Sequence, residues 1–252
     1  MPKFFVTNDQ IKDKSTIHIR GEDVNHIKNV LRKKVQDEII IGNKENGVNY
    51  QCEIVQISED EIFCKIKQEE ASEKEPNINV TIFQGLPKAE KMEWIIQKST
   101  ELGATTIIPT IMKRCVVRVN EKDEKKKKER WQKIAEVAAK QCRRDKIPKI
   151  DNFINIKKLC ENIAKYDIVI VAYEDENRNS MKTEVKNLNL LEKEKLEIGI
   201  VIGPEGGFEE SEVKDLKENG AKIVTLGKRI LRTETVALSM LSILMYELGD
   251  LN

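Results

Sequence analysis

The hydrophobic pattern changes character between residues 67 and 78. Before this point, apolar residues form short runs with strand-like alternation, interrupted by one helical stretch. After it, compact apolar runs alternate with longer stretches in which apolar residues recur about once per helical turn. The chain therefore predicts a small β domain followed by an α/β domain with a mostly parallel sheet.

The N-terminal segment predicts a small barrel. Five short runs have strand composition, namely Lys3–Thr7, Thr16–Arg20, Glu38–Ile41, Tyr50–Ile57 and Glu61–Lys67. Residues 42–47 predict a turn, and Glu22–Lys33 has helical spacing. Several short strands with one helix favour a barrel. The polar stretch Gln68–Asn77 contains Pro76 and has no apolar period, so it predicts the linker between two domains.

The C-terminal segment predicts alternating strands and helices. We expect strands at Asn79–Gln84, Thr105–Pro109, Ile168–Ala172, Ile198–Ile202 and Ile223–Leu226. We expect helices at Glu90–Leu102, Lys125–Cys142, Glu209–Asn219 and Thr233–Leu248. The β-branched runs at Ile168 and Ile198 are typical of strands buried on both faces.

Three polar loops, at residues 173–176, 203–208 and 228–232, follow predicted strands. Ligands bind outside the carboxyl ends of strands in open α/β sheets, so we expect these loops to form a ligand site. The middle loop has three glycines that let backbone N–H groups approach a ligand, and we expect a branched side chain at Gly206 to fill that approach. The alternative for residues 228–232 is a plain strand-to-helix turn capped by Thr233.

Composition narrows the classes of function. The chain has a net charge of +1 and 35% charged residues, with a basic excess between residues 113 and 149 that favours a polyanionic partner. For the run Lys125–Lys128, a solvated helix face is the alternative.

Five scattered cysteines without a CxxC pair predict reduced thiols and no metal site. Neither a GxGxxG nor a GK[ST] motif occurs, so the sequence lacks the usual dinucleotide-binding and P-loop signatures. No apolar run suits a membrane span or a signal peptide, and we therefore expect a cytoplasmic protein.

Several segments together resemble one bacterial family. They are HIKNVLR (26–32), EKMEWIIQKSTELG (90–103), EVAAKQCR (136–143), IGPEGGF (202–208) and LGKRILRTETVAL (226–238). The chain is similar to the bacterial 16S rRNA (uracil-N3) methyltransferases, the RsmE family of the SPOUT superfamily. The resemblance covers nearly the whole chain.

The resemblance implies a PUA-like β-barrel RNA-binding domain over residues 1–72 and an α/β SPOUT methyltransferase domain with a trefoil knot over residues 73–252. It implies a homodimer that transfers a methyl group from S-adenosyl-L-methionine to N3 of a decoding-centre uridine in 16S rRNA. The implied partner is the assembled small ribosomal subunit, with no metal and no membrane. By motif match, the cofactor-binding residues are Ala172, Tyr173, Glu174, Ile202, Gly203, Pro204, Glu205, Gly206, Gly207, Leu226, Gly227, Ile230, Leu231 and Thr233.

The implied reaction assigns the remaining residues. Uracil N3 becomes nucleophilic only when its proton leaves, so we expect Arg232 to stabilise the developing imide anion. Glu234 either accepts the proton or orients Arg232, and both alternatives stay open because a helix N-terminus makes a carboxylate a poorer base. The expected RNA contacts are His26, Arg32, Lys88, Lys91, Arg114, Arg143, Arg144 and Arg229. For His26 a structural role is the alternative, and for Arg229 a cofactor contact.

Two other functions are compatible with parts of the pattern. One is an RNA-binding assembly module with a vestigial pocket, although the glycine loop and the Arg232–Glu234 pair are intact. The other is a nucleotide hydrolase using the glycine loop, which lacks the required lysine and acidic metal ligands. Aromatic residues make up only 5%, so we expect recognition through RNA shape and phosphates rather than base stacking.

Overall fold

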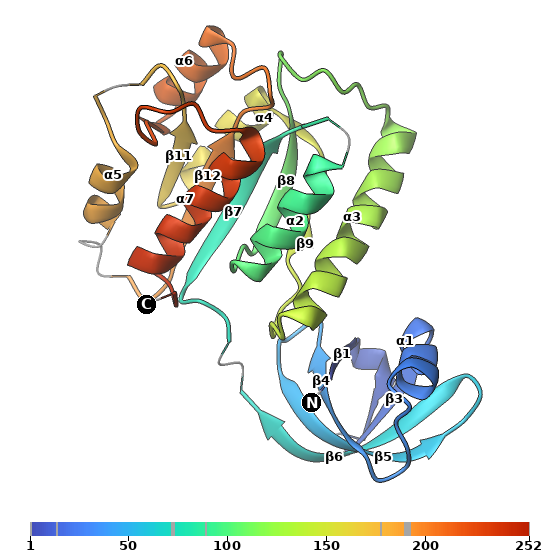
Figure 1. The fold of residues 1–252 in the computed structure, drawn as a ribbon. Coiled ribbons are helices and arrows are strands. Elements are labelled where there is room, and N and C mark those ends of the chain that lie inside the picture. Colours follow the sequence, from blue (N-terminus) through green and yellow to red (C-terminus); the bar gives the residue numbers. More distant parts are fainter. Residues whose placement is uncertain are drawn as a thin grey trace. The chain divides into compact units, whose positions relative to one another are not determined.

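The computed structural model describes residues 2–13, 15–71, 74–88, 90–176, 178–188 and 193–251. Their contacts divide the chain into two compact units (Figure 1). The first comprises Met1–Glu75 and Ala139–Ile147, and the second comprises Pro76–Ala138 and Pro148–Asn252. The predicted boundary between residues 72 and 73 lies outside the described residues and stays a prediction.

The first unit is a curled, six-stranded sheet in the order β1-β4-β5-β6-β3-β2. Its strands are β1 (Lys3–Val6), β2 (Ile11–Lys12), β3 (Thr16–Arg20), β4 (Glu38–Asn43), β5 (Asn49–Ile57) and β6 (Glu61–Glu70). The short helical elements are η1 (Asn8–Gln10), α1 (Glu22–Asn25) and the π-helical turn η2 (His26–Val30). Alternate residues of the strands, such as Ile39, Ile41, Ile54 and Ile62, point into one apolar core, as the period of two requires.

Two predictions for this unit are wrong in extent. The helix expected over Glu22–Lys33 ends at Val30. The Leu31 N–H bonds to His26 O in a widened turn, and Arg32 then takes a φ of +51°, which is not helical. The expected linker begins too early, because Gln68 to Glu70 continue β6 and pair with Gln51, Tyr50 and Asn49. Polarity alone does not mark a linker when a strand is exposed on one face.

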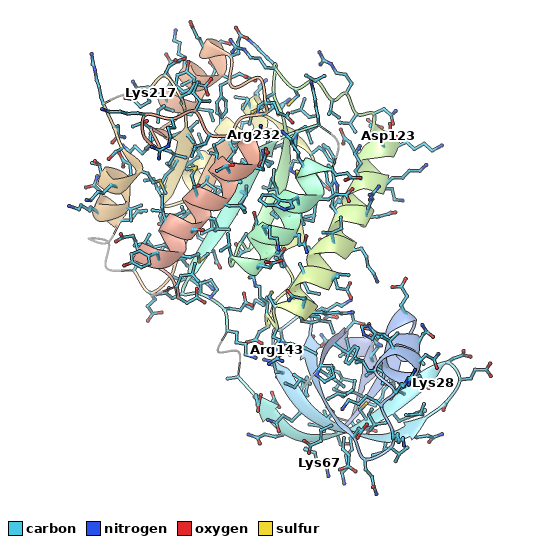
Figure 2. All side chains as sticks on the ribbon, viewed as in Figure 1. Lys28, Lys67, Asp123, Arg143, Lys217 and Arg232 are labelled. Atoms are coloured by element: carbon cyan, nitrogen blue, oxygen red, sulfur yellow. The ribbon has the colours of Figure 1, made fainter. Side chains whose placement is uncertain are left out.

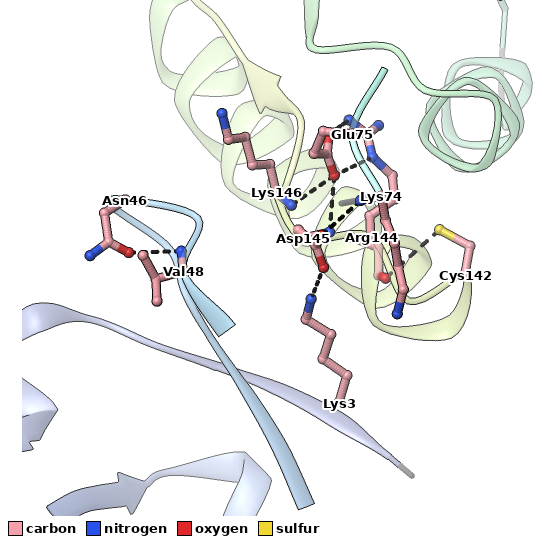
Figure 3. A network of polar contacts seen from close by, with 10 residues as sticks. Lys3, Asn46, Val48, Lys74, Glu75, Cys142, Arg144, Asp145 and Lys146 are labelled. Atoms are coloured by element: carbon pink, nitrogen blue, oxygen red, sulfur yellow. Dashed lines mark hydrogen bonds and ion pairs between the residues drawn. The ribbon is translucent and has the colours of Figure 1, made fainter. Parts of the chain in front are cut away.

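A buried polar network within the first unit joins β1 to Glu75 and to residues 144–146 (Figure 3). Lys3 donates to Asp145, and both side chains are almost fully buried. Arg144 Nη2 donates to Glu75 Oε2 at 2.6 Å, and Glu75 Oε1 accepts the backbone N–H groups of Asp145 and Lys146, each at 2.9 Å. Burial requires such pairing, because an isolated buried charge is costly.

The second unit is built on a seven-stranded parallel sheet with the main order β10-β8-β7-β12-β11-β13 and with β9 paired to β8. Its strands are β7 (Ile78–Gly85), β8 (Thr106–Ile111), β9 (Lys149–Ile150), β10 (Ile154–Asn155), β11 (Ile168–Ala172), β12 (Leu196–Ile202) and β13 (Lys222–Val224). The central strands β7 and β12 are buried along almost their whole length because helices cover the sheet.

The helices of this unit are α2 (Lys91–Glu101), α3 (Glu121–Gln141, whose last residues belong to the first unit), α4 (Ile156–Cys160), α5 (Met181–Leu188), α6 (Glu210–Glu218) and α7 (Thr233–Glu247), with the short η3 (Ile163–Lys165). Helices α2 and α7 pack side by side against the sheet (Figure 1). Helix α7 buries Ala237, Met240, Leu241 and Leu244 completely. None of the helices in the described residues is long and apolar enough to cross a membrane.

The predicted fold class is confirmed: strands alternate with helices around a parallel sheet in the second unit, and the first unit is a curled β-sheet. Helix α3 begins earlier than expected, because Asn120 Oδ1 accepts the Asp123 N–H and three acidic residues suit the first turn. Strand β13 ends at Val224 instead of Leu226. The short elements β2, β9, β10, α4 and α5 were not expected, since they are too brief to show a period.

Candidate functional site: a pocket at the strand ends

Three neighbouring parallel strands end at one edge of the sheet and release the loops that form the pocket. Strand β11 lies between β12 and β13, and their last residues are Ala172, Ile202 and Val224. A cavity of about 380 Å³ opens between these loops and the start of α7, and a smaller one of about 70 Å³ adjoins it. The two share Ala172, Glu174, Ile230, Leu231 and Val236 as walls. The placement is the one expected for a ligand site in an open α/β sheet.

Every residue predicted to bind the cofactor lines one or both of these cavities. Four further lining residues were not among those predicted to bind the cofactor, and they are Phe208, Thr225, Lys228 and Val236. Phe208 and Lys228 lie in loops that were predicted to form the ligand site, and their place in those loops was the signal that could have added them. The Tyr173 ring lies edge-on to Phe208, and burial followed by the bond to Asp175 raises the pKa of Tyr173.

Close packing of the backbone explains one glycine near the pocket, and backbone conformation explains another. A Cβ built on Gly85, the last residue of β7, would lie 2.6 Å from Pro204 N in the glycine loop. Gly207 has a φ of +68°, and its Cβ would lie 2.8 Å from Glu174 Oε1. At Gly85 the added atom would meet backbone atoms, so the loop itself would have to move. At Gly207 the Glu174 side chain could rotate away, and it is the positive φ that favours glycine.

We expected a branched side chain at Gly206 to fill the approach to the ligand, and the structure contradicts this reason. Its Cβ would point toward Arg114, 3.1 Å from that residue's Cβ and 3.2 Å from its carbonyl oxygen. A branched side chain there would press on Arg114 before it filled the cavity.

A buried hydrogen-bond chain joins three elements beneath the pocket. Gln84 Nε2 donates to Thr233 Oγ1 at 2.9 Å, and Thr233 Oγ1 donates to the Gly203 carbonyl at 2.7 Å. Gln84 also donates to Gly85 O, while its Oε1 has no protein partner among the described residues. These bonds fix the start of α7 to the glycine loop, and the Gln84–Thr233 bond is fully shielded from water while the Thr233–Gly203 bond is partly shielded.

A lysine bridges two carboxylates at the rim of the larger cavity. Lys91 Nζ lies 3.2 Å from Glu205 Oε1 and 3.4 Å from Glu234 Oε2. Glu205 also accepts the Lys88 backbone N–H at 3.0 Å. Burial opposes ionisation of Glu205, but this hydrogen bond and Lys91 outweigh it and hold its pKa below the ordinary value. The hydrogen bond with Glu205 raises the pKa of Lys91.

The two predicted catalytic residues lie two positions apart in sequence at the start of α7. Arg232 is exposed and lines the larger cavity, and Figure 2 shows it at the first turn of the helix. Glu234 follows in that turn with its side chain 18% exposed. Within the described part of the chain, the guanidinium of Arg232 makes no ion pair, so its charge is available to a ligand.

The residues predicted to contact RNA fall into two groups. Lys91 lines the larger cavity, Arg229 lines the smaller one, and Arg114 Nη1 donates to Gly206 O at 3.3 Å. Lys88 is exposed and bonds to Glu205 through its backbone. These four belong to the second unit.

The other four belong to the first unit. His26, Arg32 and Arg143 are exposed, and Arg32 and Arg143 have φ values of +51° and +60°. Arg144 differs, because it is only 5% exposed and its guanidinium is paired with Glu75. Its surroundings suit a structural ion pair rather than direct contact with RNA.

Among the residues that the structure describes, no group of three or more His, Cys, Asp or Glu side chains is placed to hold a metal ion.

Comparison with known proteins identifies the family. Residues 73–245 match the RNA methyltransferase domain family, and residues 19–67 match the RNA methyltransferase PUA domain family. The chain is 38% identical to the ribosomal RNA small subunit methyltransferase E of Bacillus subtilis, covering 98% of this chain and 97% of that protein. It is 31% identical to the protein of that name from Mesomycoplasma hyopneumoniae, over 96% of this chain and 98% of that one.

A solved structure shares the architecture over the whole length. It is the ribosomal RNA small subunit methyltransferase E of Neisseria gonorrhoeae bound to S-adenosyl methionine, which is 27% identical, with a TM-score of 0.85 and full coverage of both chains. Sequence similarity, domain matches and shared fold agree, and they confirm the resemblance seen in the motifs. The chain therefore belongs to the ribosomal RNA small subunit methyltransferase E family.

Proposed function

We propose that this protein transfers a methyl group from S-adenosylmethionine to N3 of a uridine in the 16S rRNA of the small ribosomal subunit. The observation that carries the proposal is the pocket at the ends of β11, β12 and β13, with Arg232 and Glu234 at its edge. Membership of the methyltransferase family supports the reaction class, and the Neisseria gonorrhoeae relative with its bound S-adenosyl methionine supports the cofactor.

The residues present suit this cofactor. The cavity of about 380 Å³ is within the usual range of small-molecule sites. Its walls include apolar side chains such as Ile202, Leu231 and Val236, which suit an adenine ring and the methylene groups of the methionine chain. Glu174 supplies a carboxylate for hydroxyl or ammonium groups, and the glycine loop supplies backbone donors and acceptors at close range. When bound, the sulfonium supplies an activated methyl group that a deprotonated nitrogen attacks.

The protein's own residues then have three tasks. The walls of the pocket hold the donor in one orientation, so that the base meets it in line. Arg232, whose guanidinium is free in the described structure, stabilises the negative charge that develops on the uracil when the N3 proton leaves. Glu234 is the candidate to accept that proton, because the alternative, an ion pair that orients Arg232, is not formed among the described residues, where Glu234 pairs with Lys91. Its position in the first turn of α7 favours its ionised form. Its charge is compensated by Lys91.

The proposal extends to the partners. The PUA match over residues 19–67 supports RNA binding by the first unit, where His26, Arg32 and Arg143 are exposed. Arg114 and Arg229 beside the pocket are our candidates for contacts near the target base. We place the protein in the cytoplasm, where its proposed substrate is made. Charge-neutralising variants of these arginines that bind small subunits with unchanged salt dependence would contradict the assignment.

We further propose a homodimer formed through α7 and a knotted path around the cofactor loops. The outward face of α7 carries Ile243, which is half-buried, and Tyr246, which is 63% exposed, whereas a solvated helix face is normally polar. Sedimentation of the protein as a monomer at micromolar concentration would contradict the dimer. A crystal structure in which residues 225–233 pass outside the chain rather than through a loop would contradict the knot.

Methyl transfer to small ribosomal subunits tests the function. Subunits from a strain lacking this activity are incubated with the protein and S-adenosylmethionine labelled in the methyl group. We expect the label on N3 of one uridine, and we expect Arg232→Ala to lose turnover while S-adenosylmethionine affinity changes little. Label on another atom or base would refute the specificity. Failure to bind the cofactor at millimolar concentration would favour an RNA-binding module without catalysis.

A further inference from the structure

The position of Lys91 is unusual for a residue that contacts nucleic acid. Its ammonium lies between the carboxylates of Glu205 and Glu234, at 3.2 and 3.4 Å, and its side chain is 36% exposed. A phosphate approaching Lys91 would meet both carboxylates, and their repulsion would offset the attraction of the single positive charge. The charge of Lys91 is thus already compensated within the protein.

The helix itself gives no reason for a cation at this place. Lys91 is the first residue of α2, where the helix dipole disfavours positive charge, whereas Lys98 in the last turn is placed favourably. Helix stability therefore does not account for Lys91. The contacts of Lys91 account for its position, since they join the start of α2 to the glycine loop and to α7.

We propose that Lys91 is a positioning residue of the active site, which holds the Glu234 carboxylate in its working orientation and couples it to the glycine loop through Glu205. This inference rests on the proposed function. Glu234 Oε2 is buried and has no hydrogen-bond partner in the described residues, so the ion pair with Lys91 is its compensation. Without Lys91, a shielded carboxylate would lack a counter-charge and would turn toward water.

The arrangement has a consequence for catalysis. Glu205 belongs to the loop that lines the cofactor cavity, and Glu234 belongs to the helix whose start carries Arg232. Lys91 therefore sets the geometry between the groups that hold the donor and the groups that act on the base. A shift of about 1 Å in such geometry costs up to about 100-fold in rate.

The test compares Lys91→Met and Lys91→Arg with Lys98→Met. Lys98 is a matched control because it lies on the same helix, is 35% exposed and pairs with a glutamate, Glu101, away from the pocket. Methyl transfer to small subunits gives kcat and KM, its salt dependence gives the number of phosphate contacts, and calorimetry gives S-adenosylmethionine affinity. Thermal unfolding checks that each variant is folded.

For Lys91→Met we expect kcat to fall at least about tenfold, with KM for subunits and the salt slope unchanged. Lys91→Arg restores much of kcat, because a guanidinium reaches both carboxylates, and Lys98→Met behaves like the wild type. The cofactor affinity of Lys91→Met falls by no more than a few-fold, because the pocket walls remain.

Two results would overturn the inference. A raised KM with unchanged kcat, together with a salt slope smaller by about one, would make Lys91 an RNA contact. Unchanged kinetics in Lys91→Met would leave it without a role in the reaction. Absence of methyl transfer by the wild-type protein is a different outcome, since it would refute the proposed function itself.

Discussion

Replacing Gly85 with alanine tests how closely the end of β7 supports the cofactor loop. The added Cβ would lie 2.6 Å from Pro204 N and 2.9 Å from Ile202 O. Both are backbone atoms, so no side-chain rotation relieves the contact. Restoring an ordinary separation of 3.4 Å requires the loop to move by about 0.8 Å.

The size of this displacement sets the expected effect. The moved segment begins the glycine loop, and Gly203 to Gly207 form one wall of the larger cavity. Because a misplacement of about 1 Å costs up to about 100-fold in rate, we expect Gly85→Ala to lose about that much turnover. We also expect cofactor affinity to fall at least about tenfold, equivalent to about 1.4 kcal/mol.

Calorimetry with S-adenosylmethionine and methyl transfer to small subunits measure the two effects, and Gly220→Ala is the control. Gly220 lies two residues after the end of α6, has a φ of +101° and has nothing within 4 Å of its built Cβ. Alanine there strains the backbone and lowers stability without touching the pocket. If Gly85→Ala binds the cofactor with wild-type affinity, the close packing of β7 on the loop does not shape the site.

The remaining predictions concern buried polar groups. Thr233→Val removes two hydrogen bonds and leaves the Gly203 carbonyl and one donor of Gln84 without partners, so we expect a loss of about 2–4 kcal/mol in urea unfolding and weaker cofactor binding, while Thr233→Ser keeps both. Lys3→Met leaves Asp145 buried without its cation, which we expect to cost about 3–5 kcal/mol, and an effect below 1 kcal/mol would contradict a buried pair. Burial opposes ionisation of Asp145, but hydrogen bonds from Lys3, Asn49 and the Lys74 backbone outweigh it and hold the pKa of Asp145 below the ordinary 3.8. The stabilisation from Asp145 is therefore present above that pH and is lost as the pH falls through the folded-state pKa. We expect Asp145→Asn to lack this acid dependence in pH-resolved unfolding curves.

The sequence predicted the central part of the second unit well, because its strands are long apolar runs and its helices repeat over several turns. The pocket followed from this alternation, since loops at the carboxyl ends of neighbouring strands meet at one edge of the sheet. The residues that bring particular atoms together were harder to predict. Gln84 and Gly85 end an apolar strand, and nothing in their local pattern shows that one bonds to Thr233 and the other faces Pro204.

Charge was the least reliable guide. Lys91 and Arg144 are basic residues in or near motifs, and both were predicted to contact RNA. The structure gives each of them carboxylate partners from distant parts of the sequence, Glu205 and Glu234 for Lys91 and Glu75 for Arg144. A linear pattern shows the sign of a charge but not whether the fold has already neutralised it.

The central claim is that the loops at the ends of β11, β12 and β13 enclose the methyl donor. A crystal structure of the protein soaked with S-adenosylhomocysteine tests it directly. The account predicts ligand density between residues 172–174, 203–207 and 226–231, with the sulfur directed toward Arg232. Density outside this pocket, for example in the groove beside Lys125 and Phe153 along α3, with the strand-end pocket left empty, would contradict it.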